Sequence, residues 1–179
     1  MSIPFLKFFI LTKIFLFGII NNVNSNSFLG DIMRIIKFHE CKNPSHFINE
    51  IRSCDWGAAK LLADILEQNK FDELLGGGEL FILADGEKIV SFCTLTKNDC
   101  IKDDSLYPWI GFLYTAVEYR GYRHSEKVIN AAYQSAKEQG YDRVYLATDH
   151  IGFYEKYGFI YLENRIDIYD EDSRIYYKQ

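Results

Sequence analysis

The chain has 179 residues, of which 48% are hydrophobic and 16% aromatic, and its net charge is −5 at pH 7. A chain of this length and composition can bury a full core, so we expect one folded domain. The acidic balance argues against a general nucleic-acid binder, which would carry a basic stripe, and no nucleic-acid partner is expected.

The first 32 residues differ from the rest of the chain. Residues 5–20 (FLKFFILTKIFLFGII) are apolar, but Lys7 and Lys13 interrupt them. A membrane span needs about 20 apolar residues, and a central lysine costs roughly 2.5–3.5 kcal/mol. Three interpretations stay open: translation that starts at Met33, a secretory signal or anchor, and some other extension. In each of them residues 1–32 lie outside the fold, and a membrane partner is expected only if they are retained.

Residues 33–179 form the predicted domain, in which apolar periodicity alternates between strand and helix patterns. Hairpins on one side and a strand–helix–strand crossover in the middle predict a mixed α/β (α+β) sheet with helices on both faces. The predicted elements are a strand at 33–38, helices at 46–56 and 58–69, a hairpin at 79–95 that turns at Asp85-Gly86, a strand at 109–117, a helix from Arg123 or His124 to Gly140, a strand at 143–148, a short helix at 150–157, and strands at 159–169 and 173–178.

The most informative stretch is EYRGYRHSEKVI, residues 118–129. It follows the almost continuously apolar run 109–117 (WIGFLYTAV) and enters a helix. The first four N–H groups of a helix lack internal partners, and the helix dipole places about half a positive charge there. The loop Tyr119–Ser125 is therefore a candidate anion site, and an ordinary helix entry with solvated arginines is the alternative. Its basic side chains are Arg120, Arg123, His124 and Lys127.

The cysteines give no sign of a metal centre. The chain contains no CxxC motif, and its four histidines do not pair with cysteines at metal-ligand spacing. We expect no metal, and we expect reduced thiols in a cytoplasmic protein. The four cysteines are Cys41, Cys54, Cys93 and Cys100.

Two segments carry a resemblance to a known family. LYTAVEYRGYRHSEKVI, which begins at Leu113, and the later YDRVYLATDHIGFYEKYGF are similar to the core of the GNAT-type acetyl-CoA-dependent N-acetyltransferases. The family hallmark is Arg or Gln, two free positions, Gly, one free position, and Gly or Ala. Arg120, Arg123 and Ser125 occupy those positions here, and FYEKYGF (153–159) matches the second recurrent segment. The element order of residues 33–179 fits the same family.

The resemblance implies a mixed, mostly antiparallel central sheet with helices on both faces. It also implies that acetyl-CoA is the co-substrate and lies beside strand 109–117. Its pyrophosphate would rest on the amides of residues 119–125, and its pantetheine arm would pair with the strand edge near Tyr114 and Thr115. The implied cofactor-binding residues are Tyr114, Thr115, Arg120, Gly121, Tyr122, Arg123, His124 and Ser125.

This chain departs from the hallmark because Arg123 and Ser125 replace its two small residues. Backbone amides hold the phosphates, so glycine is required only where φ is positive or a side chain would collide with the anion. Gly121 is retained. We expect the backbone of Arg123 to be helical. We expect its guanidinium to contribute part of the phosphate binding as a charge-assisted hydrogen-bond donor. Ser125 adds a small hydroxyl that can also donate.

The resemblance places Tyr154 where a tyrosine often protonates the departing thiolate. A phenol is protonated at neutral pH and can deliver a proton to sulfur. Strand 109–117 contains no carboxylate, so His150, beside Asp149 at the predicted start of a short helix, is the candidate general base. A cofactor contact or a surface position are the alternatives for His150. Tyr157, one turn further on, is expected in the core.

The expected function is direct transfer of an acetyl group from acetyl-CoA to a primary amine of a small molecule or peptide. The alternative is a catalytically silent GNAT-shaped module that binds CoA or a protein, and the chain is expected to be a monomer or a homodimer. Four acidic residues of the predicted acceptor region could receive a cationic amine or belong to a solvated surface. They are Asp55, Glu163, Asp167 and Asp170.

Overall fold

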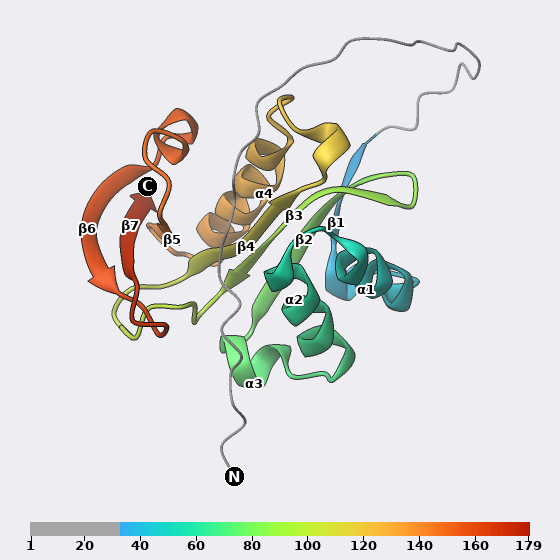
Figure 1. The fold of residues 1–179 in the computed structure, drawn as a ribbon, viewed down its shortest axis with the longest axis horizontal. Coiled ribbons are helices and arrows are strands. Elements are labelled where there is room, and N and C mark those ends of the chain that lie inside the picture. The colour runs from blue at the N-terminus through green and yellow to red at the C-terminus, as the bar shows by residue number, and fades with distance from the viewer. Residues whose placement is uncertain (1–32) are drawn as a thin grey trace.

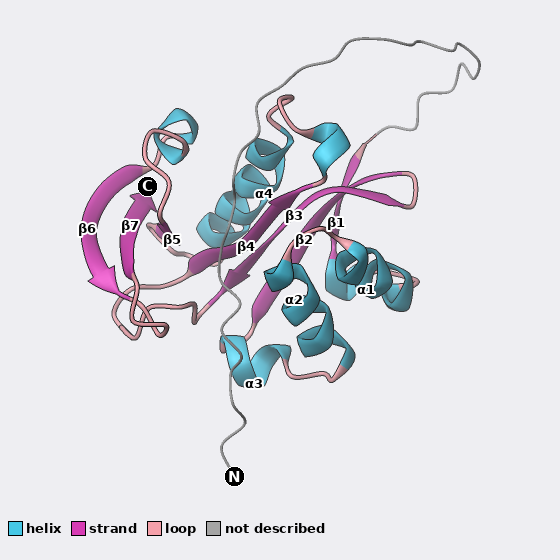
Figure 2. Ribbon diagram, in the orientation of Figure 1, coloured by secondary structure: helices cyan, strands magenta, loops and turns pink. Residues whose placement is uncertain are grey.

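A seven-stranded sheet with the strand order β1-β2-β3-β4-β5-β7-β6 forms the centre of the computed structural model, which describes residues 33–179 (Figure 1). Every neighbouring pair of strands is antiparallel except β4 and β5, which are parallel. Helices α1 and α2 cover one face and α4 covers the other (Figure 2). The predicted mixed, mostly antiparallel sheet is confirmed.

The elements follow the predicted order along the chain. The strands are β1 (Arg34–Lys37), β2 (Gly78–Asp85), β3 (Lys88–Thr96), β4 (Trp109–Thr115), β5 (Val144–Thr148), β6 (Ile160–Ile166) and β7 (Asp172–Lys178). The α-helices are α1 (Pro44–Ser53), α2 (Gly57–Glu67), α3 (Phe71–Leu75) and α4 (His124–Glu138). Three 3-10 helices are η1 (Phe38–Glu40), η2 (Val117–Tyr119) and η3 (Tyr154–Tyr157).

Two cores lie on opposite faces of the sheet, and β2 shows how one strand serves both. Side chains alternate between the faces of a strand. Leu80 and Ile82 therefore pack under α1 and α2, while Phe81 and Leu83 pack under α4. The four side chains are 0–2% exposed, which explains why the strand reads as a continuous apolar run.

The helical half of the domain differs from the prediction at its boundaries. The first helix begins at Pro44 rather than His46, because Asn43 accepts a hydrogen bond from the His46 N–H (3.4 Å) and Pro44 occupies the first helical position. The predicted helix 58–69 ends early, since Asn69 adopts a left-handed conformation with φ 54°. The short helix α3 follows it.

The predicted helix at 150–157 is also shorter than expected. Only Tyr154–Tyr157 is helical, and the turn is of the 3-10 type. Gly152 has φ 74°, a conformation that a right-handed helix excludes. The expectation that His150 lies at the start of a helix is therefore wrong.

Residues 1–32 and the three interpretations of them lie outside the described part of the chain. None of the helices within residues 33–179 has the length and apolar character that crossing a membrane requires.

We predict that Gly78→Ala destabilises the fold more than Gly140→Ala. Both glycines have positive φ, 128° and 87°, so each substitution places an alanine in a strained conformation. Only at Gly78 would the new Cβ collide with the carbonyl oxygen of Leu95 on the neighbouring strand, while nothing lies within 4 Å at Gly140. The expected losses of unfolding free energy in urea titrations are about 3 kcal/mol and about 1 kcal/mol. Equal losses would show that the collision has no energetic effect.

Candidate active site

The strands β4 and β5 meet at one end and separate at the other, an arrangement we call the strand fork. Their only paired residues are Trp109 and Tyr145, and the Tyr145 N–H also donates to the carbonyl of Pro108 (2.9 Å). From Gly111 onward β4 pairs only with β3, while β5 pairs with β7. In Figure 1, β5, β6 and β7 form a separate group of strands to the left of β4. Among residues 33–179, the fork leaves one edge of β4 without a strand partner from Gly111 onward.

A bulge in β4 lies immediately after the fork. Thr94 pairs with Gly111 and Phe92 pairs with Tyr114, so the two residues between Gly111 and Tyr114 oppose a single residue of β3. One of them, Phe112, has a positive φ of 44°. Bulges bend a strand and redirect its side chains, and they are frequent beside active sites.

Tyr114 and Thr115 are the two residues predicted to pair with the pantetheine arm, and only the backbone of Thr115 faces the open edge of β4. The carbonyl of Tyr114 accepts a hydrogen bond from the Ser91 hydroxyl of β3 (2.6 Å), and the Ala116 N–H donates to Val90 on the same side (3.0 Å). Backbone groups alternate along a strand, so the polar backbone groups of Thr115 point away from β3 and toward the fork.

The loop of residues 119–125, which we call the α4 loop, presents unpaired N–H groups. Within residues 33–179, the five successive N–H groups from Gly121 to Ser125 donate to no other group. Gly121 has φ 87°, and nothing lies within 4 Å of the place where a Cβ would stand. The loop begins the 15-residue helix α4, whose dipole adds positive potential at this end. Its chemistry fits a phosphate group.

Arg123 has a left-handed backbone, which corrects the expectation of a helical one. Its φ and ψ are 58° and 29°, in a region that glycine occupies with less strain. Its guanidinium donates to both carboxylate oxygens of Glu126 (2.9 and 3.1 Å) and to the carbonyl of Lys156 (3.3 Å). It also lies over the Tyr157 ring, 5.3 Å from the centroid. The arginine side chain therefore connects α4 with η3 and does not extend over the α4 loop.

Arg120 is also directed away from the α4 loop. Its Nε donates to the carbonyl of Thr115 (3.0 Å), and its guanidinium lies 3.5 Å from the carboxylate of Asp55. Tyr114 completes this cluster, because its hydroxyl donates to Asp55 (2.6 Å) and its ring lies 5.7 Å from the guanidinium. Arg120 therefore fixes the end of β4 against the connection between α1 and α2.

His124 and Tyr122 are the predicted side chains that remain beside the α4 loop. The Nδ1 atom of His124 is buried and has no hydrogen-bond partner among the described residues. Burial lowers the pKa of His124, and the charge of Lys127 lowers it further, so the ring is held neutral. Its neighbour Tyr122 is 73% exposed, and the two ring centroids are 6.1 Å apart. An unpaired ring nitrogen at the first turn of α4 fits a hydrogen-bonding ligand.

Ser125 faces the protein interior. Its hydroxyl lies 3.1 Å from the hydroxyl of Tyr157, and both residues are buried. The expected core position of Tyr157 is confirmed. Ser125, like Arg123, connects the start of α4 to η3.

Tyr154 and His150 lie together beyond the end of β5. Tyr154 is 8% exposed, and its ring centroid lies 6.5 Å from that of His150. Burial raises the pKa of Tyr154 most, and the charge of Asp149 raises it further. The phenol is therefore protonated throughout the neutral range. The side chain of His150 is 35% exposed, and its Nδ1 lies 3.7 Å from Asp149.

Among the four acidic residues considered as acceptor contacts, three have carboxylates with structural partners. Asp55 binds Tyr114 and lies near Arg120, as described above. Asp167 shapes the β6–β7 turn, because its carboxylate accepts the N–H groups of Tyr169 (2.8 Å) and Glu171 (3.0 Å). Glu163 pairs with Arg165 (2.6 Å). Asp170 lies at this turn with φ 64°.

One acidic residue that the sequence analysis did not single out lies at the strand fork. Asp99 comes from the loop between β3 and β4, and its carboxylate lies against Gly111 of β4. Gly111 is a glycine within a strand of large side chains, and such a residue often marks the close approach of another group. This glycine is the one local sequence feature that could have indicated the approach of Asp99 to β4.

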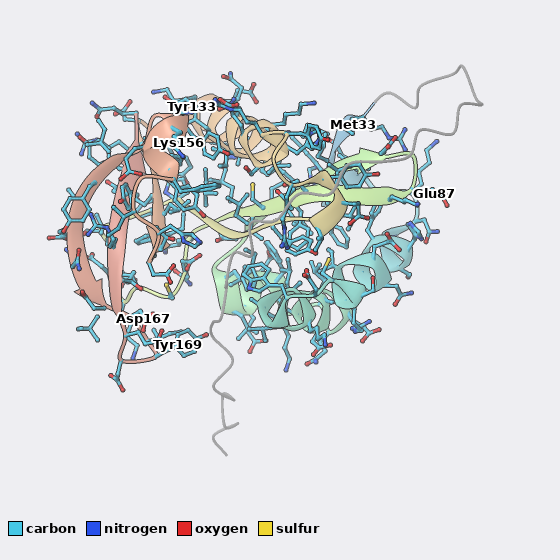
Figure 3. The ribbon with its side chains drawn as sticks, turned by 45° about the horizontal axis from the view of Figure 1, so that its top comes forward. Met33, Glu87, Tyr133, Lys156, Asp167 and Tyr169 are labelled. Carbon is cyan, nitrogen blue, oxygen red and sulfur yellow. The ribbon has the colours of Figure 1, made fainter. Side chains whose placement is uncertain are left out.

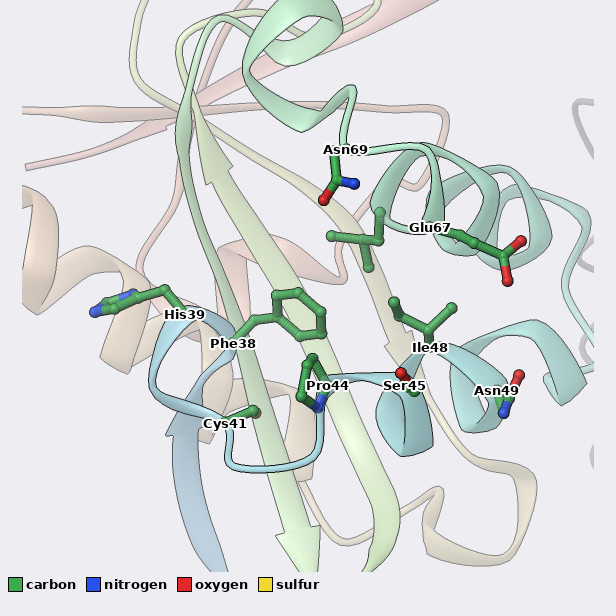
Figure 4. A pocket seen from close by; sticks show the side chains of 10 residues that line it. Phe38, His39, Cys41, Pro44, Ser45, Ile48, Asn49, Glu67 and Asn69 are labelled. Carbon is green, nitrogen blue, oxygen red and sulfur yellow. The ribbon is translucent and has the colours of Figure 1, made fainter.

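A pocket of about 460 Å³ lies elsewhere, between η1, the start of α1 and the end of α2 (Figure 4). None of the predicted cofactor or catalytic residues lines it. Its lining residues are Phe38, His39, Cys41, Pro44, Ser45, Ile48, Asn49, Leu66, Glu67 and Asn69. The cofactor chemistry is therefore assigned to the strand fork and the α4 loop and not to this pocket.

The strand fork, the α4 loop and the buried tyrosine have the arrangement expected of an acyltransferase that uses a coenzyme A thioester. The model of the acetyltransferase (GNAT) family matches residues 45–159. The chain therefore belongs to the GNAT acetyltransferase family. It is an acetyltransferase, and acetyl-CoA is its co-substrate. Among residues 33–179, no group of three or more His, Cys, Asp or Glu side chains is placed to hold a metal ion.

Solved structures share this fold. An acetyltransferase from Streptococcus agalactiae 2603 has 22% identity over 84% of this chain and 99% of that chain, with a TM-score of 0.58. Aminoglycoside 6'-acetyltransferase type Ii has 16% identity over 82% of this chain and 97% of that chain, with a TM-score of 0.61. This chain spans 62% of a Bacillus anthracis str. Ames protein crystallised with acetyl coenzyme A, with 25% identity over 57% of this chain and a TM-score of 0.48. No curated protein matches the sequence.

We predict that Arg123→Gly weakens acetyl-CoA binding by an indirect route. The substitution leaves the Glu126 carboxylate unpaired in the first turn of α4, where its charge opposes phosphate. The expected rise in Kd is about 3- to 10-fold, or roughly 0.7–1.4 kcal/mol, in a calorimetric titration. The double variant Arg123→Gly/Glu126→Gln is the control, and it should restore the affinity. An unchanged or lower Kd for Arg123→Gly would contradict the prediction.

Proposed function

We propose that this chain is an N-acetyltransferase that moves an acetyl group from acetyl-CoA directly to a primary amine of a small molecule or peptide. The observation that carries the proposal is the strand fork, where the open edge of β4 lies between the unpaired amides of the α4 loop and the buried Tyr154. A thioester bound along this edge would have its phosphates at one end of the fork and its reacting carbonyl near the other.

The α4 loop is the proposed phosphate site. The N–H groups from Gly121 to Ser125 would donate to the pyrophosphate oxygens. His124 would add its unpaired Nδ1, and Tyr122 would add an exposed ring. The N–H of Thr115 would donate to a carbonyl of the pantetheine arm, since the Thr115 carbonyl already accepts from Arg120. Arg120, Arg123 and Ser125 are assigned positioning roles, because their side chains fix the two ends of the loop.

The bound thioester supplies an acyl carbon that an amine can attack. The amine nitrogen forms a bond to this carbon, the carbon–sulfur bond breaks, and the sulfur leaves with the electron pair. Tyr154 is proposed to give its hydroxyl proton to that sulfur, since a phenol is protonated at neutral pH and can donate to a thiolate that forms beside it. No covalent bond to the protein is required.

His150 is proposed as a contact near the reacting group and as one candidate for the general base. Its side chain is partly exposed and lies beside Tyr154, so it can exchange protons with solvent. Solvent water is the alternative route for the proton from the amine.

A catalytically silent CoA-binding or interaction module is the second candidate function. The observation that favours it is that Arg123 hydrogen-bonds to Glu126 and Ser125 hydrogen-bonds to Tyr157. The two positions that are small residues in the hallmark therefore carry side chains with fixed contacts here. We further propose that residues 33–179 are the catalytic domain, that the protein acts in the cytoplasm, and that it is a monomer or a homodimer.

The enzyme hypothesis predicts amine-dependent release of CoA thiol. The screen should include polyamines, amino acids, aminoglycosides and peptide N-termini, with a thiol reagent as the readout. With an acceptor that works, Tyr154→Phe should lower kcat by about 10²- to 10⁴-fold and leave the Kd for acetyl-CoA unchanged, because only the proton donor is lost.

Tyr157→Phe is the matched control for Tyr154→Phe. It removes a hydroxyl from the same 3-10 helix, and the hydroxyl bonds to Ser125 and not to the fork. Its main effect should be a loss of about 1 kcal/mol of unfolding free energy, with kcat reduced far less. If acetyl-CoA stabilises the protein against heat and no amine releases thiol, the silent module is the better description.

A further inference from the structure

Asp99 brings a carboxylate to the middle of the sheet. Its Oδ2 atom occupies the space that a side chain on Gly111 would need, and its Oδ1 accepts the N–H of Cys100 (2.6 Å). The residue as a whole is half-buried, because part of its surface faces the loop between β3 and β4. The carboxylate itself points inward onto the backbone of β4. Gly111 is thus the residue that makes room for it.

Thr94 points its hydroxyl to the same place. Its Oγ1 lies 3.2 Å from the position of a Cβ on Gly111. The residue is fully buried, and within residues 33–179 its hydroxyl has no hydrogen-bond partner. A buried hydroxyl without a partner is costly, by roughly 1–3 kcal/mol. A ligand that donates or accepts a hydrogen bond beside Gly111 would satisfy it.

The position of Asp99 relative to Tyr154 follows from the alternation of side chains along β3. Cys93 is on the α4 face and is close enough to Tyr154 to affect its pKa. Thr94, the next residue, points to the opposite face, toward Asp99. The carboxylate and the phenol therefore approach the start of the fork from opposite faces of the sheet. A reaction at the fork would have a proton acceptor on one face and a proton donor on the other.

The groups around Asp99 are mostly acidic or neutral. Burial raises the pKa of Asp99, and hydrogen bonds from Cys100 oppose this rise. The β6–β7 turn packs against the same loop, since the Ile168 N–H donates to the Cys100 carbonyl (2.9 Å). This turn brings Asp167 and Tyr169, which Figure 3 labels at the end of the β6 and β7 strands. The titratable side chains that face Asp99 are Cys100, Asp167 and Tyr169, and Lys102 and Asp104 line the adjoining cavity of about 280 Å³ with it.

We propose that Asp99 is the residue that receives the acceptor amine, which is therefore a cationic primary amine. The inference rests on the proposed transfer to an amine. Asp99 binds the ammonium group as a carboxylate beside Gly111, with Thr94 as a second hydrogen-bonding partner. Asp55 is less suited to this role because it is already bound to Tyr114 and lies near Arg120.

In the proposed reaction two protons leave the amine nitrogen and one proton is added to the sulfur. Asp99 takes one proton from the ammonium group, which becomes a neutral amine, and later returns it to solvent. The nitrogen lone pair forms the bond to the acyl carbon, and the carbon–sulfur electron pair leaves with sulfur. The second proton leaves the nitrogen for solvent as the amide forms. The sulfur takes the hydroxyl proton of Tyr154, and Tyr154 regains a proton from solvent. The products are an amide and a free thiol, with no oxidant or reductant involved.

The test is Asp99→Asn, measured by steady-state kinetics across pH with an acceptor found by the screen. We expect kcat/KM for the amine to fall about 10²- to 10⁴-fold, with an unchanged Kd for acetyl-CoA. In the wild type, activity should be lost as the pH falls through the raised pKa of Asp99, because the protonated acid cannot take a proton. This acidic limb should be absent in Asp99→Asn.

Asp142→Asn is the control, because the side chain of Asp142 is fully exposed on the α4–β5 connection, and it should behave as the wild type. Thr94→Val is the second variant, in case Asp99→Asn does not fold. It keeps the side-chain shape, removes the unpaired hydroxyl, and should raise KM for the amine about 3- to 10-fold with a smaller change in kcat.

The outcomes separate this inference from the proposed function. Wild-type kinetics and an intact acidic limb in Asp99→Asn would overturn the role of Asp99 and leave the acetyltransferase reaction standing. If Asp99→Asn cannot be purified, an unchanged KM for the amine in Thr94→Val would also overturn the role of Asp99 and leave the acetyltransferase reaction standing. A wild-type protein that binds acetyl-CoA but acetylates no amine would overturn both.

Discussion

The separation of β4 from β5 is the constraint on which the site depends. One edge of β5 pairs with β7 over five residue pairs. The other edge of β5 pairs with β4 only where Tyr145 lies opposite Trp109. The free edge of β4 is therefore a consequence of how the last three strands pair. An edge with unpaired N–H and C=O groups inside a fold invites an extended partner, and the pantetheine arm is an extended chain with amides.

The same geometry decides from which face each of the proposed reacting groups approaches the fork. Side chains of β3 and β4 alternate between the α1–α2 face and the α4 face, so a point on the fork is accessible from both faces. The α4 face supplies Tyr154 from η3, and the α1–α2 face supplies Asp99 from the loop before β4. Because β4 also leads directly through η2 into α4, the amides of the α4 loop follow the open edge along the chain.

The features with local signals could be predicted from the sequence. The apolar run of β4, the hairpin between β2 and β3 and the entry to α4 all depend on neighbouring residues, and the structure contains all three. The hairpin turn is Gly86-Glu87, one residue later than the predicted Asp85-Gly86, because Asp85 pairs with Lys88. The conformation of Arg123 depends on contacts with Glu126 and with η3, which lies more than thirty residues later in the chain. Asp99 approaches Gly111 only because the loop folds back on the strand that follows it. Neither arrangement has a periodic pattern that could reveal it.

The replacement of glycine by Arg123 changes how the α4 loop is held. A left-handed conformation costs about 1–2 kcal/mol for a residue with a side chain. A partly exposed ion pair with Glu126 contributes about 0.2–1 kcal/mol, and the contact with the Tyr157 ring about 0.5–1 kcal/mol, so the contacts offset most of the strain. A glycine would allow the loop to move independently of η3. The arginine and the Ser125–Tyr157 contact instead connect the amides of the α4 loop to the segment that carries Tyr154, so the proposed phosphate site and the proposed proton donor are linked through these contacts.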